Sequence, residues 1–203
     1  GWEYPWVLSQ LESLTGGARV VDCGCGESDF PLELFRRGFR PVGLDIFIPD
    51  SRKYSGYGIR PRHIRKLRGR VEFINASLHD IPDSEASFDA VVCISVMEHI
   101  VIDHASDPQF HLRCLDEMMR VLRRDGLMVC TYDTILNPDA VFAHTPEWGE
   151  SGWYYLDDIR YLLSKGMKLK NPAARLVTRE EILMDEDAFF VPPDMYLTQG
   201  FGS

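Results

Sequence analysis

Strand-like and helix-like stretches alternate along the first two-thirds of the chain, and this alternation limits the choice of fold more than any other feature. Five short apolar stretches are expected to be strands: 18–23, 40–46, 71–74, 88–95 and 127–132. Helical patterns are expected at 28–38, 60–68 and 110–122. Such alternation is typical of βαβ units that build a parallel sheet. The sequence therefore predicts an α/β fold.

The last third of the chain continues with two expected helices and two β-prone pieces: 154–165, 178–184, 188–191 and 195–198. Two late strands after five βα units predict a mostly parallel seven-stranded sheet, completed by an antiparallel C-terminal hairpin. No domain boundary is visible, so residues 1–203 are predicted to form a single domain. The chain opens with Gly1 rather than Met. Residue 1 is therefore expected to be a cleavage point or a chosen boundary, and a further N-terminal segment of the protein stays possible.

Composition and charge argue against several functional classes. The 203 residues are 45% hydrophobic and 26% charged, which is ordinary for a globular protein with one substantial core. No apolar run approaches the ~20 residues that span a bilayer, so no membrane partner is expected. The net charge of −9 argues against a general nucleic-acid binder, whose affinity depends on neutralised phosphates. The five cysteines lack the paired spacing of a metal site, so no metal is predicted and a reducing cytoplasm is the expected location.

The charge is uneven, because arginines and lysines gather within residues 52–70. Two interpretations stay open for this basic segment. It is either a solvated helix face beside a loop or a patch for an anionic substrate or partner.

The turn after the first strand is the segment best suited to bind a ligand. Gly24 and Gly26 stand two apart there, and a helix follows at once. Glycine is needed where a ligand lies against bare backbone, because a Cβ would occupy the ligand's place. The following helix N-terminus suits a carboxylate, and Asp22 can accept a hydrogen bond from an ammonium. A ligand with both α-amino and α-carboxyl groups would match this pairing.

A second acid, Asp45, ends the second strand and is expected beside the glycine turn. There its carboxylate would accept hydrogen bonds from both hydroxyls of a ribose. Dinucleotide-binding folds also combine a glycine turn with an acid for the ribose, but their motif has a third glycine where this chain has Asp29. Glu27 and Asp29 would also repel a pyrophosphate, but they would not repel a sulfonium cation. The comparison favours S-adenosylmethionine over NAD.

Together these residues resemble the class I S-adenosylmethionine-dependent methyltransferases, especially the small single-domain type related to ubiquinone-biosynthesis enzymes. The resemblance runs from about residue 18 to residue 132. It rests on five stretches in the right order: Asp22 to Gly26, Asp45, Val71 to Pro82, Ser87 to Ile100, and Leu115 to Gly126. It implies a three-layer Rossmann-like methyltransferase fold, with S-adenosylmethionine as cofactor and S-adenosylhomocysteine as product.

The resemblance also assigns residues to the donor site: Asp22, Gly24, Cys25, Gly26, Asp45, Ile46, Ser77, Leu78 and Ser95. The family usually has an acid near the adenine amino group, where this chain has Ser77. The Ser77 hydroxyl and the Leu78 amide are therefore expected to hold the adenine, with Ile46 and Phe47 packing against it. Ser95 stands where metal-binding relatives have a Glu, which again predicts no metal.

His99 lies just past the fourth strand, where acceptor and methyl group should meet. It is either a general base or a loop histidine hydrogen-bonded to the backbone. Further residues are expected around the acceptor pocket: His104, Asp133, Trp148, Trp153 and Tyr154. The aromatic ones form either a mobile cover or the core of the next helix. Trp2, Tyr4 and Trp6 precede the first expected helix and either close over the donor or simply pack.

The predicted reaction is methyl transfer by in-line displacement to a small-molecule acceptor, with oxygen as the favoured nucleophile. One alternative is a macromolecular substrate docked on the basic 52–70 segment. The other is a non-catalytic member that binds the donor or a partner protein, which the departures at Ser28 and Ser77 keep open. The sequence leaves the acceptor and the oligomeric state undetermined.

Overall fold

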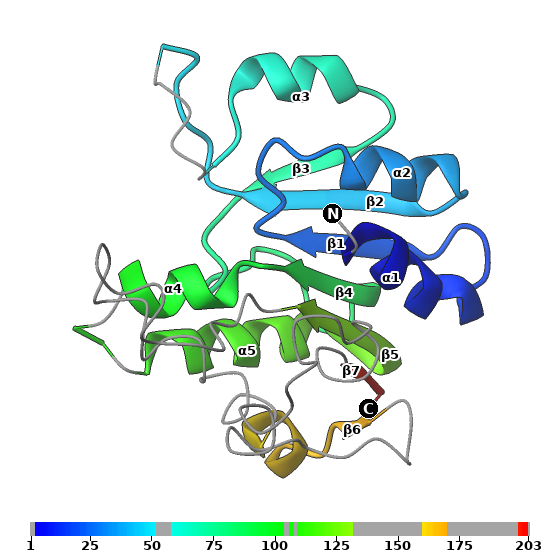
Figure 1. The fold of residues 1–203 in the computed structure, drawn as a ribbon, viewed down its shortest axis with the longest axis vertical. Helices are drawn as coiled ribbons and strands as arrows, with labels where there is room; N and C mark the ends of the chain where they lie inside the picture. The colour runs from blue at the N-terminus through cyan, green and yellow to red at the C-terminus, as the bar shows by residue number, and fades with distance from the viewer. Residues whose placement is uncertain are drawn as a thin grey trace, which may run out of the picture.

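A parallel sheet of five strands forms the centre of the molecule (Figure 1). The computed structural model describes residues 3–51, 58–103, 106–107, 109–131, 160–169 and 199–202. The five strands are β1 (Arg19–Cys23), β2 (Arg40–Asp45), β3 (Glu72–Asn75), β4 (Phe88–Ile94) and β5 (Leu122–Thr131). Their spatial order is β3-β2-β1-β4-β5, and every neighbouring pair is parallel. All five predicted strands are confirmed, and with them the parallel sheet.

Two short strands lie beyond β5, namely β6 (Lys168–Leu169) and β7 (Gln199–Gly202). β7 pairs antiparallel with both β5 and β6. The β-prone pieces expected at 188–191 and 195–198 fall outside the described residues, as does the helix expected at 178–184. Residues 160–164 are helical, but the start of the helix expected at 154–165 is also outside them. The C-terminal hairpin therefore stays a prediction.

Helices cover both faces of the sheet, because side chains alternate along each strand. Val20 and Val92 pack with the first pair of helices, α1 (Glu3–Gln10) and α2 (Phe30–Arg36). Val21 and Cys93 point the other way and pack against α5 (Phe110–Val121). A smaller cluster joins Leu67 of α3 (Pro61–Leu67) to α2 beside the β3 edge. The result is the predicted three-layer arrangement.

The strand order reverses at β1, which has β2 on one side and β4 on the other. In open α/β sheets, ligands bind at such a switch point, beyond the carboxyl ends of the strands. The register aligns Asp22 of β1 with Gly43 of β2, and Asp45 with Asn75 of β3. The fold therefore brings the two predicted acids to one edge of the sheet.

Two segments differ from the sequence predictions. Tyr4 and Trp6 do not precede the first helix but lie within α1, a short helix fixed by the burial of Val7 and Leu8. Helix α4 (Met97–Asp103) occupies the expected loop after β4. Between its pairings with Phe88 and Ala90 of β4, β5 contains a bulge in which Asp125 has a left-handed φ of +64°. Both short helices bury side chains in the core, Val7 and Leu8 from α1 and Met97 from α4.

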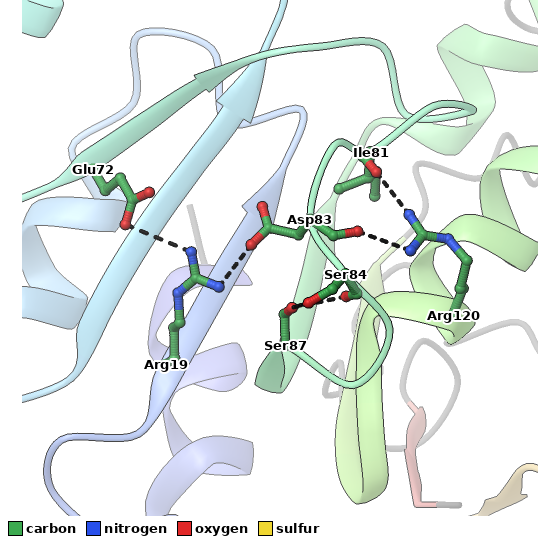
Figure 2. A network of polar contacts seen from close by, with 7 residues as sticks. All are labelled: Arg19, Glu72, Ile81, Asp83, Ser84, Ser87 and Arg120. Carbon is green, nitrogen blue, oxygen red and sulfur yellow. Dashed lines mark hydrogen bonds and ion pairs between the residues drawn. The ribbon is translucent and has the colours of Figure 1, made fainter.

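A polar network holds the long connection between β3 and β4 (Figure 2). The Arg120 guanidinium donates to the carbonyl oxygens of Ile81 and Asp83, at 2.6 and 2.8 Å. Glu117 accepts from the Ile81 amide at 2.9 Å and binds Arg120 as well. On the other side, Arg19 Nη1 donates to Asp83 Oδ1 at 2.8 Å. Ser77 and Leu78, the predicted adenine-binding residues, lie at the start of this connection. The network therefore fixes the segment that carries them, through contacts near the opposite edge of the sheet.

No helix among the described residues is long and apolar enough to cross a membrane.

We expect Arg120→Ala to lower the free energy of unfolding by about 2 kcal/mol, because hydrogen bonds to charged groups contribute ~1.5–3 kcal/mol. Urea denaturation followed by circular dichroism measures the change. The matched control is Arg124→Ala, an exposed position in the β5 bulge, which should shift the unfolding energy by less than about 0.5 kcal/mol. Equal, small effects of the two substitutions would show that Arg120 does not hold the connection.

Candidate functional site

The glycine turn is held tightly between the ends of β2 and β4. The amides of Gly24 and Cys25 both donate to the Leu44 carbonyl oxygen, at 2.8 and 3.2 Å. Gly24 has a φ of +75°, and a Cβ there would lie 2.7 Å from the side chain of Val96. Gly24 is thus required by close packing as well as by its backbone conformation.

Gly26 differs from Gly24, because the position that a Cβ would occupy at Gly26 is open space. Its φ is +52°, and a Cβ there would meet no heavy atom within 4 Å. Its amide donates to Asp45 Oδ2 at 2.8 Å. The peptide at Gly26 is therefore bare on one side and tied to the end of β2 on the other. This is the geometry expected of a backbone that a ligand approaches closely.

Asp45 closes the contact between β2 and the turn. Its second oxygen, Oδ1, accepts from the Ile46 amide at 2.7 Å. Burial raises the pKa of the Asp45 carboxyl, and the two backbone hydrogen bonds act in the opposite direction. Each carboxylate oxygen can accept more than one hydrogen bond. The side chain can thus hold the turn and still accept hydrogen bonds from a ligand.

Asp22 is nearly inaccessible, with 2% of its surface exposed. Burial, followed by the nearby negative charge of Asp45, raises the pKa of Asp22 to about 8. The carboxyl group therefore holds a proton at neutral pH in the free protein. A cationic group placed beside it would favour the ionised form and displace that proton. The role of Asp22 as the partner of an ammonium stays a prediction.

Glu27, which follows the glycines, is paired with Arg60. This pairing was not predicted from the sequence. Arg60 donates from Nε to Glu27 Oε1 at 2.6 Å and from its backbone amide to the same oxygen at 3.2 Å. A further contact joins Arg60 Nη2 to Glu27 Oε2. The side-chain hydrogen bond from Arg60 is the main cause that lowers the pKa of Glu27 to about 2. Because the two residues are 33 positions apart, only a fold that docks α3 against the turn reveals the pair.

Other cations of the basic segment also have acidic partners. Lys66 lies 3.0 Å from Asp29, and Arg65 lies 3.0 Å from Asp50. The expected repulsion of a pyrophosphate by Glu27 and Asp29 is therefore weaker than predicted, since both acids have cationic partners. The same pairs fit a solvated helix face better than a free docking patch.

The residues expected around adenine behave differently from one another. Ile46 and Phe47 are 45% and 37% exposed at the end of β2, so they offer apolar surface beside Asp45. Leu78 points into the core and offers its backbone only. The Ser77 hydroxyl is hydrogen-bonded to His79 Nδ1 at 2.7 Å, a partner that the sequence analysis did not anticipate.

Ser95 has an unusual backbone and an unexpected partner. Its φ is +48°, in the left-handed region that residues other than glycine rarely adopt. Its amide donates to the carbonyl oxygen and to Oγ1 of Thr131, both at 3.2 Å. Its hydroxyl donates to Glu3 Oε1 at 2.6 Å. Glu3 belongs to α1, so no local sequence signal could have placed it here.

His99 is half-buried within α4, and its amide donates to the Val96 carbonyl oxygen at 3.0 Å. It is thus a helical residue rather than a loop residue, although it stays just beyond β4. The residues expected around the acceptor lie outside the described residues: His104, Asp133, Trp148, Trp153 and Tyr154. Within the described residues, no group of three histidine, cysteine or acidic side chains could hold a metal ion.

The chain is similar to known methyltransferases in sequence and in fold. A family model described as "Methyltransferase domain" matches residues 21–130. An "uncharacterized methyltransferase" of Mycobacterium sp. (strain KMS) is 32% identical over 127 residues, which cover 63% of this chain and 43% of that protein. A ubiquinone biosynthesis O-methyltransferase of Hahella chejuensis is 30% identical over 41% of this chain and 33% of its own length. The chain thus spans less than half the length of these relatives.

One solved structure shows the likeness in fold. It is a SAM-dependent methyltransferase from Aquifex aeolicus, with a TM-score of 0.60 and 14% identity. The match covers 98% of this chain and 88% of that one. At this identity the match concerns the arrangement of helices and strands.

We expect Asp22→Asn to stabilise the free protein in a pH-dependent way. The pKa of Asp22 lies at about 8 in the folded state against 3.8 for an unperturbed group. Burying the acid therefore costs nothing below about pH 4, and the cost grows until about pH 8. The gain in unfolding free energy of the variant should therefore rise between about pH 4 and about pH 8. It should reach a few kcal/mol, since one pKa unit is worth ~1.4 kcal/mol. Urea denaturation at pH 5 and pH 8 measures it; a gain independent of pH would contradict the assignment.

Proposed function

This chain belongs to the methyltransferase domain family, and from that premise we propose that it transfers a methyl group from S-adenosylmethionine to a small molecule. The main support is the bare peptide at Gly26, joined by a 2.8 Å hydrogen bond to the acid that ends β2. An amino-acid-bearing nucleoside needs both features, a backbone that admits its methionine part and an acid for its ribose. The family predicted from the sequence is confirmed by the match.

The described residues fit such a donor chemically. Gly26 leaves the space that a Cβ would fill. Asp45 would accept hydrogen bonds from the ribose, and Asp22 would take the ammonium. Ile46 and Phe47 would pack against the adenine with their exposed apolar surfaces. We propose Gly24, Cys25, Ser77, Leu78 and Ser95 as further donor contacts, as the family resemblance implies.

Catalysis by this chain is proposed to consist mainly of alignment. When bound, the donor supplies a methyl group on a sulfonium, which makes the sulfur a good leaving group. The protein must hold the acceptor in line with it, and alignment of this kind contributes ~7–11 kcal/mol. An acceptor that must lose a proton also needs a base, which contributes typically 10²- to 10⁴-fold. His99, just beyond β4, is the residue that we propose for this role.

We propose oxygen as the methylated atom and a small molecule as the acceptor. The similarity to a ubiquinone biosynthesis O-methyltransferase supports the first part. The net charge of −9 and the ion pairs of Arg65 and Lys66 support the second, since they leave less positive surface for a polyanion. We also propose a single domain in a reducing cytoplasm, with a seven-stranded sheet that the antiparallel hairpin completes.

Asp45→Asn tests the ribose assignment. The amide oxygen of asparagine can still accept one backbone hydrogen bond, so the fold should persist. Loss of charge-assisted hydrogen bonds of ~1.5–3 kcal/mol should weaken S-adenosylmethionine binding about ten- to a hundredfold. Isothermal titration calorimetry measures the affinity, and a thermal melt checks the fold. Unchanged affinity would show that Asp45 does not hold the ribose, and no binding by the natural chain would end the proposal.

Gly26→Ala tests the bare peptide itself. The added methyl group meets no protein atom, so we expect a modest loss of stability from the left-handed φ, about 1 kcal/mol. Donor binding should fall much further, because the methyl group enters the space left for the ligand. Gly69→Ala is the matched control, because its φ of +80° is also left-handed and its surroundings are also open, but it follows α3. Equal binding by the two variants would contradict the proposed cradle.

A further inference from the structure

The N-terminal helix reaches the carboxyl edge of the sheet through one side chain. Glu3 Oε1 accepts from the Ser95 hydroxyl and from the Thr131 hydroxyl, both at 2.6 Å. Ser95 directly follows β4, and Thr131 is the last residue of β5. Three segments that are distant in the sequence thus meet at this carboxylate. The packing of Val7 and Leu8 in the core holds the rest of α1 in place.

This meeting point lies close to the glycine turn. Ser95 is followed by Val96, whose side chain would touch a Cβ at Gly24 at 2.7 Å. The left-handed Ser95 backbone is held by its two hydrogen bonds from the amide to Thr131. Glu3 therefore binds Ser95, whose neighbour Val96 borders the glycine turn. This contact lies on the β4 side of the switch point.

The charge at this edge is unevenly distributed among its acids. Asp22 holds a proton in the free protein, Asp45 accepts hydrogen bonds from the amides of Gly26 and Ile46, and Glu27 is paired with Arg60. The two groups that hold Glu3 are neutral hydroxyls, which orient its carboxylate without cancelling its charge. A carboxylate in a partly buried place interacts with a nearby cation more strongly than one in bulk water does.

We propose that Glu3 supplies the negative charge that faces the sulfonium of S-adenosylmethionine, so that α1 is part of the donor site. This inference rests on the proposed function. The carboxylate would stabilise the positively charged donor and have little effect on S-adenosylhomocysteine, whose sulfur is neutral. Its consequence is discrimination: the enzyme favours the methyl donor over the demethylated product.

Glu3→Gln separates charge from structure. The amide oxygen can still accept hydrogen bonds from both hydroxyls, so the contact that holds α1 is kept and only the charge is lost. Calorimetric titration with S-adenosylmethionine and with S-adenosylhomocysteine gives the two affinities. We expect the first to fall about tenfold, as a charge pair at a partly screened distance implies, and the second to change by less than about twofold.

Two further variants complete the experiment. Glu12→Gln removes an exposed carboxylate from the same N-terminal segment and should leave both affinities unchanged. Glu3→Asp keeps the charge and should retain most of the preference for the sulfonium. Equal weakening of both ligands by Glu3→Gln would reveal a purely structural residue and overturn the inference, as would no change in either. If the natural chain binds neither ligand, the proposed function itself fails, which is a different result.

Discussion

The hydrogen bond from the Gly26 amide to the Asp45 carboxylate is the contact on which the site depends. It joins the turn after β1 to the end of β2, and the amides of Gly24 and Cys25 reinforce it through the Leu44 carbonyl. The turn is thereby fixed while one side of its peptide stays open. Without this contact the parallel register and the Leu44 carbonyl would still hold the start of the turn, but the Gly26 peptide would lose its link to the end of β2.

Burial and pairing give the acids of this edge different properties. Burial keeps Asp22 protonated at neutral pH, whereas the arginine beside Glu27 keeps that residue ionised. Asp22 is therefore ready to respond to an incoming cation, and Glu27 serves to dock α3 against the turn. Glu3 differs from both, because neutral hydroxyls orient its charge. Three carboxyl groups with similar intrinsic acidity thus have three different surroundings, one buried, one paired with an arginine and one held by hydroxyls.

The far edge of the sheet supports this arrangement. The connection from β3 to β4 starts at the predicted adenine residues and ends near the amino ends of the strands. Arg120 of α5 holds its middle through the carbonyl oxygens of Ile81 and Asp83, and Arg19 binds the Asp83 side chain (Figure 2). Glu117 of the same helix accepts from the Ile81 amide. Because the contacts of Arg120 and Glu117 involve backbone groups of Ile81 and Asp83, they constrain the path of the connection rather than a single side chain.

The sequence by itself determined the five parallel strands, the layers of helices and the neighbourhood of Asp22, Gly26 and Asp45. It could do so because side-chain alternation, helical periodicity and glycine at a turn are local properties of the chain. Only the tertiary structure decided that Glu27 pairs with Arg60 and that Glu3 binds Ser95 and Thr131. Those partners are separated by 33, 92 and 128 positions, so their meeting depends on how the layers pack. Helix α1 was missed for the same reason, since burial against the sheet fixes it more than its own eight residues do.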